Sequence, residues 1–216
     1  MSFTDECWAQ IAPILAGIEE LPFLRGLEDG GLDRALFTGY MAQDALYLDG
    51  YARALAAAAA QATTGEDIAF WAESARGAIV VERSLHAAHV ADFAHAQASP
   101  TTTAYTNHLL ALAGGGCYPA LAAGLLPCFW IYEDVGTRLK SRLGSRLAGH
   151  PFEDWISQYG DPAFAASTAT AIALVDRLAG DAGPGTRERM RAAFVTAARY
   201  EWMFWDAAWR AEAWPI

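Results

Sequence analysis

Four chemically reactive side chains stand at positions where a helical pattern requires a buried apolar residue. Asp44, Glu82, Cys128 and Glu201 each fall on an apolar stripe of helical spacing, in four different segments of the chain. A buried carboxylate without a partner is costly, so each acid needs a hydrogen-bond partner or a raised pKa. Acids and a thiol that point inward from separate segments therefore predict a polar pocket inside the protein.

Each of these residues also has a purely structural interpretation. A single inward Asp or Glu often anchors a hydrogen bond in the core, and a Cys on an apolar stripe often serves as a small hydrophobic residue. We adopt that interpretation for Cys7 and Cys117. Glu201 differs, because it lies on the same stripe as Phe204 and no cationic residue stands three or four positions away to neutralise it.

A metal site is the main alternative use for the inward acids. Glu82 and His86 have i,i+4 spacing and could supply two ligands of a carboxylate-bridged di-iron centre in a helical bundle. Such a centre needs a matching acid and His pair, but Asp206 is followed four residues later by Arg210. The first predicted helix holds no His that could ligate haem iron. We therefore expect no metal and no cofactor, and keep a di-iron oxidase as an alternative.

The elements that must position these residues are helices. Val, Ile and Thr form no alternating run, whereas Ala, Leu, Arg and Glu dominate. The fold class is therefore all-α, a single-domain helical bundle over residues 1–216. The expected helical segments cover residues 4–20, 33–62, 66–97, 100–114, 118–147, 152–159, 162–179 and 186–214.

Composition excludes several classes of protein. The chain has 216 residues with 15 Lys and Arg against 25 Asp and Glu, a net charge of −10. No basic face of the kind that binds nucleic acid is expected. Three widely spaced Cys form neither a metal motif nor a disulfide framework, and no secretory signal is visible. A reducing cytoplasm is the expected location.

One uncharged stretch has the length of a membrane span. No Asp, Glu, Lys or Arg occurs between Asp92 and Glu133, and residues 109–132 are long enough to cross a bilayer. Helix breakers stand inside this stretch, at Gly114–Gly116, Pro119 and Pro127. We therefore predict an interrupted core helix and no membrane partner.

Several motifs, taken in order along the chain, resemble one known family. They are Gln43-Asp44-x-x-Tyr47-Leu48-x-x-Tyr51-x-Arg53, Glu82-x-x-Leu85-His86, Leu125-Leu126-Pro127-Cys128-x-Trp130-x-Tyr132, Tyr159 and Glu201-x-x-Phe204-Trp205-Asp206. This series resembles the TenA family, the thiaminase II or aminopyrimidine aminohydrolase proteins, in the branch that has a catalytic Cys. The likeness runs over nearly the whole chain, and the combination of the Cys block with the later Glu block is specific.

The resemblance implies a haem-oxygenase-like all-α fold without haem and a homotetramer. It also implies hydrolysis of 4-amino-5-aminomethyl-2-methylpyrimidine to the hydroxymethyl pyrimidine and ammonia, in some members cleavage of thiamin, and a role in thiamin salvage. By the same resemblance Cys128 is the nucleophile, Glu201 the acid/base, and Asp44 the group that binds the aminopyrimidine edge. The implied aromatic pocket residues are Tyr47, Tyr105, Tyr132, Tyr159 and Phe204.

The sequence departs from the family pattern upstream of Cys128. The family commonly has an acidic residue there, whereas this chain reads Gly114-Gly115-Gly116-Cys117-Tyr118-Pro119. The departure leaves local geometry and substrate preference open. A second functional hypothesis stands beside the hydrolase, a non-catalytic pyrimidine-binding or regulatory protein in which the pocket persists and turnover is lost.

Overall fold

The computed structural model describes the backbone of residues 1–89 and 96–216, and the side chains of these residues except 81–89. Within these ranges the elements are all helical, with no strand, which confirms the all-α prediction. The helices are α1 (Phe3–Gln10), α2 (Ala12–Glu19), α3 (Pro22–Asp29), α4 (Arg34–Gln61), α5 (Gly65–His89), α6 (Pro100–Gly114), α7 (Tyr118–Leu143), η1 (Gly144–Leu147), α8 (Glu153–Tyr159), α9 (Pro162–Asp181) and α10 (Pro184–Trp209).

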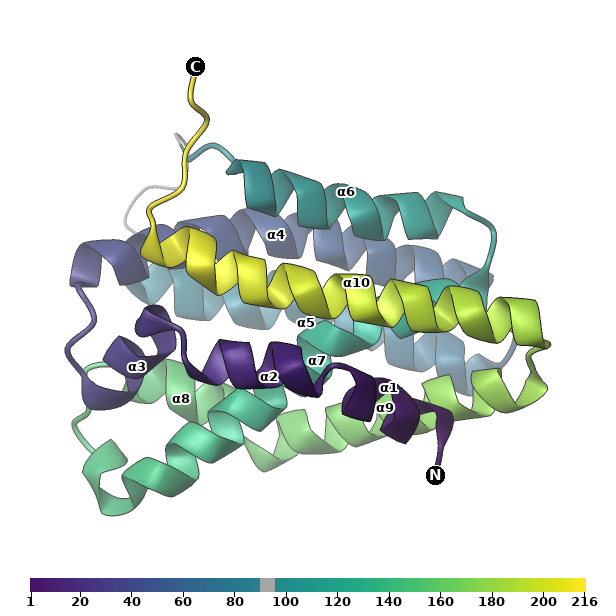
Figure 1. Cartoon of the computed structure of the whole chain (residues 1–216), viewed down its shortest axis with the longest axis horizontal. Coiled ribbons are helices and arrows are strands. Elements are labelled where there is room, and N and C mark those ends of the chain that lie inside the picture. Colours follow the sequence, from purple (N-terminus) through teal and green to yellow (C-terminus); the bar gives the residue numbers. More distant parts are fainter. Residues whose placement is uncertain (90–95) are drawn as a thin grey trace.

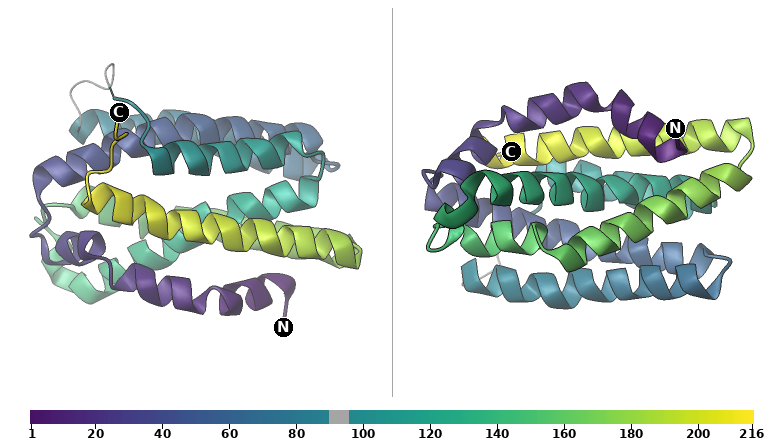
Figure 2. Two further views of the ribbon diagram at one scale, coloured as in Figure 1. Left: turned by 45° about the horizontal axis from the view of Figure 1, so that its top comes forward. Right: turned by 90° about the horizontal axis from the view of Figure 1, so that it is seen from below.

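Helix α7 runs through the middle of the bundle (Figures 1 and 2). It packs against α10, α9, α8, α4 and α6, while α4 also packs against α5 and α6. The short helices α1, α2 and α3 lie along the outside of α10 and α9, and the C-terminal residues leave α10 near the start of α6 (Figure 1). Functional side chains on α4, α7 and α10 are thereby directed toward a shared interior.

The N-terminal region differs from the prediction. The expected single helix over residues 4–20 is two helices, because Pro13 has no N–H to donate to the carbonyl of Ala9. We expected a simple break between Pro22 and Gly31, but these residues form α3. Pro22 occupies its first turn, where no donor is needed, and Gly30 ends it with a φ of +77°.

The predicted interruption of the uncharged stretch is confirmed, and the segment predicted over residues 118–147 is one helix for most of its length. The chain breaks after Gly114, as expected, but α7 then continues through Pro119 in its first turn and Pro127 in its interior. Helix α7 ends at Leu143 and a 3₁₀ turn follows, whereas we expected the helix to reach residue 147. In the part of the chain that the structure describes, no helix is sufficiently long and apolar to span a membrane.

The last helix ends earlier than predicted, at Trp209 rather than residue 214. Ala211 adopts a positive φ of 46°, which no regular right-handed helix allows, and the chain turns toward α6. Helix α4 closely matches its prediction. It begins after Asp33, whose side chain accepts a hydrogen bond from the N–H of Ala35 at 2.6 Å.

A close contact between α7 and α8 depends on Gly136. A Cβ atom at this position would overlap the backbone of Tyr159 and Gly160. We expect Gly136→Ala to lower the free energy of unfolding by about 1–3 kcal/mol, because backbone atoms cannot move aside as a flexible side chain can. Urea denaturation measures this change.

Gly39→Ala is the matched control, because it also lies inside a helix and its added Cβ would meet nothing within 4 Å. Alanine is the better helix former, so this variant should be as stable as the parent or about 1 kcal/mol more stable. Equal stability of the two variants would contradict the packing argument.

Candidate active site

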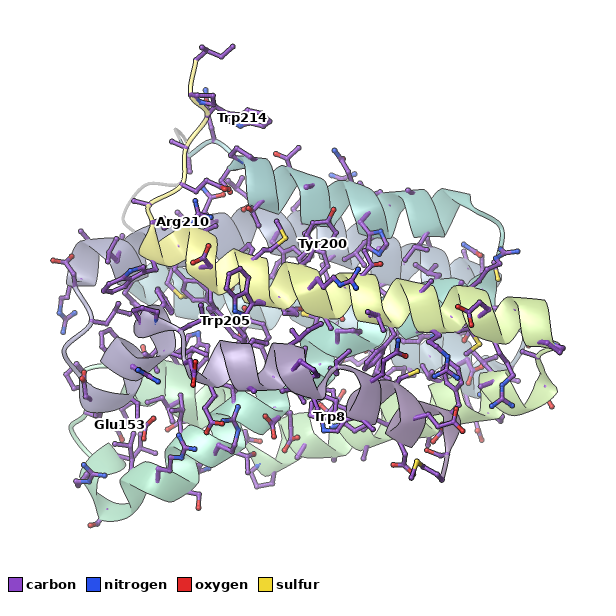
Figure 3. The ribbon with its side chains drawn as sticks, viewed as in Figure 1. Trp8, Glu153, Tyr200, Trp205, Arg210 and Trp214 are labelled. Atoms are coloured by element: carbon purple, nitrogen blue, oxygen red, sulfur yellow. The ribbon has the colours of Figure 1, made fainter. Side chains whose placement is uncertain are left out.

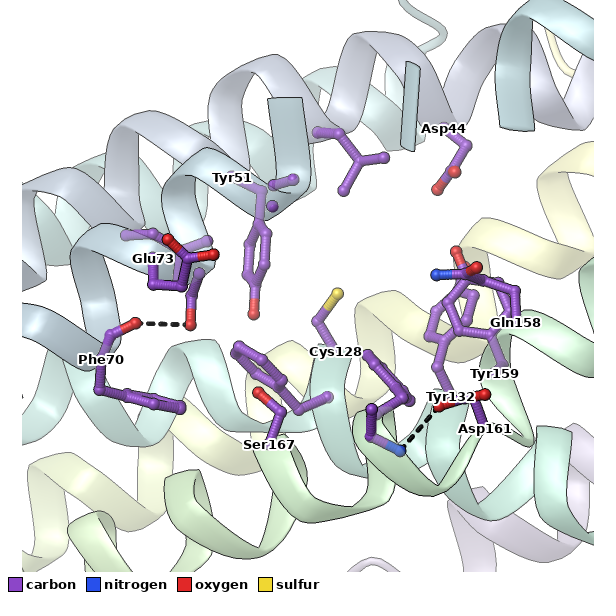
Figure 4. A pocket seen from close by; sticks show the side chains of 18 residues that line it. Asp44, Tyr51, Phe70, Glu73, Cys128, Tyr132, Gln158, Tyr159, Asp161 and Ser167 are labelled. Carbon is purple, nitrogen blue, oxygen red and sulfur yellow. Dashed lines mark hydrogen bonds between the residues drawn. The ribbon is translucent and has the colours of Figure 1, made fainter. Parts of the chain in front are cut away.

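A cavity of about 550 Å³ opens between α4, α5, α7, α8 and the start of α9 (Figure 4). Its walls are largely aromatic and aliphatic, and a few polar groups point into it. The lining residues are Asp44, Leu48, Tyr51 and Leu55 from α4, Phe70, Glu73, Ser74, Gly77 and Ala78 from α5, Cys128, Phe129 and Tyr132 from α7, Gln158 and Tyr159 from α8, and Asp161, Ala163, Phe164 and Ser167.

Cys128 stands at the centre of this cavity. Its sulfur points into the open space, with Tyr51 on one side and Gln158 and Tyr159 on the other (Figure 4). Burial raises the pKa of the thiol well above its usual value, and the nearby carboxylates of Glu201 and Asp44 raise it further. The resting side chain is therefore a neutral thiol that needs a base or a cation to become a nucleophile.

Two tyrosines of α4 face the sulfur. The phenol groups of Tyr47 and Tyr51 oppose the upward shift of the Cys128 pKa. Tyr51 donates a hydrogen bond to the carbonyl of Leu125 at 2.9 Å, which holds its ring beside the cavity. The hydroxyl of Tyr47 is buried and has no hydrogen-bond partner among the described residues. It is thus a donor available to the thiolate or to a bound molecule.

Glu201 is a buried carboxyl group on α10, with 1% of the residue exposed. Burial raises its pKa to about 8, the hydrogen bond from Tyr105 opposes this shift, and the charge of Asp44 adds to it. The Tyr105 hydroxyl donates to Oε1 of Glu201 at 2.6 Å. A carboxyl group with a pKa near 8 is protonated at neutral pH, so it can donate a proton and later take one back.

Asp44 is the other buried acid of the site. It lies on α4 with 3% of the residue exposed, and its carboxylate faces the cavity opposite Cys128 (Figure 4). Asp44 and Cys128 thus line one cavity from two helices, and Glu201 on a third helix lies near enough for its charge to raise the Cys128 pKa. The stripe positions Phe37, Tyr40, Met41, Tyr47 and Leu48 around Asp44 are all buried.

Aromatic rings pack around Tyr132 and form a floor to the site. The hydroxyls of Tyr132 and Tyr40 are 3.1 Å apart, and Trp155 donates to Tyr40 at 3.2 Å. The ring centroid of Tyr132 lies 4.7 Å from that of Tyr159 and 4.8 Å from that of Trp205. Such a floor offers flat surfaces against which a heteroaromatic ring can stack.

The structure divides the predicted site residues into two layers. Asp44, Cys128, Tyr132 and Tyr159 line the cavity directly. The other four, Tyr47, Tyr105, Glu201 and Phe204, are not part of its lining but form the layer next to it. Tyr47 contacts two of the others, since its ring centroid lies 4.7 Å from that of Tyr105 and 5.6 Å from that of Phe204. Their direct contact with a ligand stays a prediction.

Some lining residues were not predicted. Tyr51 continues the stripe of Asp44 and Tyr47, and this spacing is a signal that could have identified it. No sequence pattern marks those that come from α5 and from the junction of α8 and α9. They include Phe70, Glu73, Ser74, Gln158, Asp161 and Ser167.

The metal alternative concerns residues that the structure does not place. The side chains of Glu82 and His86 lie outside the described residues. Among the side chains that are described, no group of three or more His, Cys, Asp or Glu is arranged to hold a metal ion.

The cavity lining is acidic. Asp44, Glu73 and Asp161 contribute carboxylates, and the described lining residues include no Lys, Arg or His. Asp161 also begins α9, since its Oδ1 accepts the N–H of Ala163 at 2.7 Å. A site of this charge favours a ligand that carries a positive charge or several N–H donors.

Comparison with known proteins gives a match over almost the whole chain. The model of the TENA/THI-4/PQQC family matches residues 8–211. An aminopyrimidine aminohydrolase from Bacillus subtilis is 32% identical over 226 residues, covering 99% of this chain and 92% of that protein. The thiamine biosynthesis multifunctional protein ThiED of Corynebacterium efficiens is 35% identical over 212 residues. That match covers 96% of this chain, which spans only 28% of the corynebacterial protein.

Solved structures agree with the sequence matches. A TenA homologue from P. horikoshii OT3 has a TM-score of 0.85 and 27% identity, with 97% of this chain and 99% of that chain covered. A Shewanella denitrificans domain described as having a heme oxygenase-like fold has a TM-score of 0.69 at 14% identity, covering 96% and 92% of the two chains. The second likeness concerns the fold alone, and it agrees with the predicted fold class.

Proposed function

Because the chain belongs to the TENA/THI-4/PQQC family, we propose that it hydrolyses 4-amino-5-aminomethyl-2-methylpyrimidine to the hydroxymethyl pyrimidine and ammonia. We further propose that it can cleave thiamin at the same methylene, and that both reactions serve thiamin salvage. The observation that carries this proposal is that Asp44 and Cys128 line one acidic, aromatic cavity, while Glu201 is buried in the layer next to it and its charge reaches the Cys128 thiol. The similarity to an aminopyrimidine aminohydrolase supports it.

The binding step uses the walls of the cavity. An aminopyrimidine is flat, so the rings of Tyr132 and Tyr159 can stack on it. Its amino group donates one hydrogen bond, and the adjacent ring nitrogen donates a second when it is protonated, so the two oxygens of one carboxylate can bind this edge. Asp44 faces the cavity opposite Cys128 and is the group we assign to that edge.

The charge of the substrate helps to create the nucleophile. An aminomethyl group is an ammonium ion at neutral pH, and it would enter a site with no described cation in its lining. A positive charge beside Cys128 favours the thiolate over the thiol, because it offsets the burial and the carboxylate charges that hold the thiol pKa high. The free enzyme therefore holds an unreactive thiol, and substrate binding activates it.

The first chemical step breaks the C–N bond. The sulfur of Cys128 forms a bond to an electrophilic carbon of the pyrimidine ring, and the ring electrons then expel nitrogen from the exocyclic methylene. The thiol has by then lost its proton to solvent, and the substrate ammonium group loses one to solvent after the sulfur attacks. Glu201, protonated below its pKa of about 8, then supplies the proton with which the free amine leaves as ammonia. Ammonia departs, and the pyrimidine stays attached to the enzyme through sulfur.

The second step consumes water. A water molecule adds to the exocyclic methylene and gives a proton to the Glu201 carboxylate, which thereby returns to its starting form. The carbon–sulfur bond breaks, the ring regains its aromaticity, the alcohol leaves, and the released sulfur takes a proton from solvent. The sum is substrate plus water giving hydroxymethyl pyrimidine plus ammonia, with the protein unchanged.

The test is to supply purified protein with the aminomethyl pyrimidine and, separately, with thiamin. We expect ammonia and hydroxymethyl pyrimidine in a one-to-one ratio from the first substrate, and measure them by a coupled dehydrogenase assay and by chromatography. Thiazole release reports cleavage of the second. Tight pyrimidine binding in calorimetry without any turnover of either compound would replace this proposal with the non-catalytic binding protein.

A further inference from the structure

The C-terminal residues beyond α10 are fastened to the start of α6. A side-chain oxygen of Glu212 accepts a hydrogen bond from the N–H of Thr101 at 2.8 Å. The indole N–H of Trp214 donates to the carbonyl of Ala98 at 2.9 Å. Figure 3 shows Trp214 on this C-terminal segment, above the point where α6 begins. The backbone of Glu212 is also held in place, since its N–H donates a hydrogen bond to the carbonyl of Ala207 at 2.9 Å.

Gln43 holds the same region from the other side. Its Oε1 accepts hydrogen bonds from the N–H of Ser99 at 2.8 Å and from the hydroxyl of Thr102 at 2.7 Å. Its Nε2 donates to the carbonyl of Gln97 at 2.9 Å. The first turn of α6 is thus tied both to α4, through Gln43, and to the C-terminal segment, through Glu212.

The next turn of α6 carries Tyr105. This tyrosine is 1% exposed, and its hydroxyl donates to Glu201 at 2.6 Å. Its ring stacks on Tyr200, the residue before Glu201, with centroids 5.2 Å apart and planes 13° apart. The helix start and the hydrogen bond to the acid are therefore parts of one rigid element, and movement of the first turn moves the Tyr105 hydroxyl.

We propose that Gln43 and Glu212 are positioning residues for the acid/base carboxylate, because they fix the start of α6 so that Tyr105 donates to Glu201. This inference rests on the proposed function for the role of Glu201 in turnover. The geometric part stands on these hydrogen bonds alone, and neither Gln43 nor Glu212 lines the cavity.

The titration of Glu201 reports whether the hydrogen bond is in place. The groups that face it are Asp44, Tyr47 and Tyr51 from α4, Tyr105 from α6, and Cys128 and Tyr132 from α7. Of these, Tyr105 lowers the Glu201 pKa and the Asp44 charge raises it. Loss of the Tyr105 bond must therefore move the pKa of Glu201 above about 8.

A direct charge effect of Glu212 has the opposite sign. Removing a negative charge makes every other carboxyl group easier to ionise, so it lowers the pKa of Glu201. Glu212→Gln removes this charge but keeps an oxygen that can accept the Thr101 N–H, whereas Glu212→Ala removes both. The difference in the Glu201 pKa between the two variants therefore measures the positioning effect separately from the charge effect.

The experiment titrates Glu201 directly by ¹³C NMR of labelled carboxyl groups, with Glu201→Gln to identify its signal. We expect Glu212→Ala to raise the midpoint by about 0.5 to 1 pH unit. Glu212→Gln should leave it within about 0.2 pH unit or move it down slightly. Gln43→Ala, which changes no charge, should also raise it. Glu188→Gln is the matched control, because that acid is exposed on α10, where it pairs with Arg191 of the same helix.

The comparison with Tyr105→Phe completes the test. This variant removes the hydrogen bond itself, so combining it with Glu212→Ala should give no further shift. Additive shifts, or a Glu212→Ala protein whose Glu201 signal does not move, would overturn the positioning role. Because the titration is read without turnover, these results remain distinct from a failure of the proposed function, which would show as absent ammonia release in the parent protein.

Discussion

Ammonia release from the aminomethyl pyrimidine should fall by about 10³-fold or more when Cys128 is replaced by serine. The sulfur is the group in the cavity that can attack the ring, and it is aimed at the open space (Figure 4). A serine hydroxyl in the same place is a far weaker nucleophile, because it has no neighbouring base strong enough to ionise it.

The loss should appear in kcat and hardly in KM. Serine and cysteine have nearly the same shape, so the walls that hold the ring stay in place. Steady-state assays of ammonia release, together with calorimetry of pyrimidine binding to Cys128→Ser, separate the two parameters. A variant that binds the pyrimidine normally and does not turn it over would identify the sulfur with the chemical step.

Cys117→Ser is the matched control for this substitution. Cys117 is half-buried at the cap of α7 and is not part of the cavity lining. Its variant should keep the parent rate within about twofold, because surface changes away from a site rarely alter chemistry. Comparable losses in both variants, or full activity in Cys128→Ser, would rule out attack by the Cys128 sulfur.

The central part of the site could be predicted because it depends on local periodicity. Asp44 and Tyr47 share one face of α4, and Glu201 and Phe204 share one face of α10, at spacings that any regular helix preserves. The period alone therefore indicates that these residues point inward. It does not indicate which helices adjoin, and that part came from the resemblance of the ordered motifs to one family.

The outer wall of the cavity could not be predicted in this way. Glu73, Ser74 and Gln158 line the cavity because α5 packs against α4 and α8 packs against α7. Their side chains are also typical of solvent-exposed helix faces. Only the packing distinguishes the two settings, and packing between distant segments leaves no periodic signal in one sequence.

The prolines show the same limit for helix boundaries. Pro13 separates two helices, Pro22 starts one, and Pro127 lies inside one. Proline lacks a donor in all three places, but the cost depends on the position in the helix and on the surrounding contacts. Helix α7 is buried along most of its length, and this packing holds it together through Pro127.

The free energy of unfolding should decrease as the pH rises from about 4.5 to about 8, and Glu201→Gln should remove this dependence. The folded protein keeps the Glu201 proton up to about pH 8, whereas the unfolded chain loses it near the usual glutamate pKa of 4.5. Between these values the unfolded state binds fewer protons, so stability falls as pH rises. Below 4.5 both states are protonated, and above 8 both are ionised, so the contribution is constant outside this window.

The size of the effect follows from the difference between the two pKa values. A shift from 4.5 to about 8 corresponds to about 3–5 kcal/mol, because each pH unit is worth about 1.4 kcal/mol. Urea denaturation at about pH 5, 6, 7, 8 and 9 gives the free energy of unfolding against pH for the parent and for Glu201→Gln. Their difference should change by that amount across the series, while Glu188→Gln should run parallel to the parent.

The same substitution should also remove activity, by about 10²- to 10⁴-fold in kcat. Glutamine keeps an oxygen that can accept the Tyr105 hydrogen bond, so the site retains its shape, but it has no proton to give to the leaving amine. The parent rate should decline on the alkaline side as Glu201 ionises near pH 8. A Glu201→Gln protein that is stabilised at high pH but fully active would mean that this carboxyl group is buried without a catalytic role.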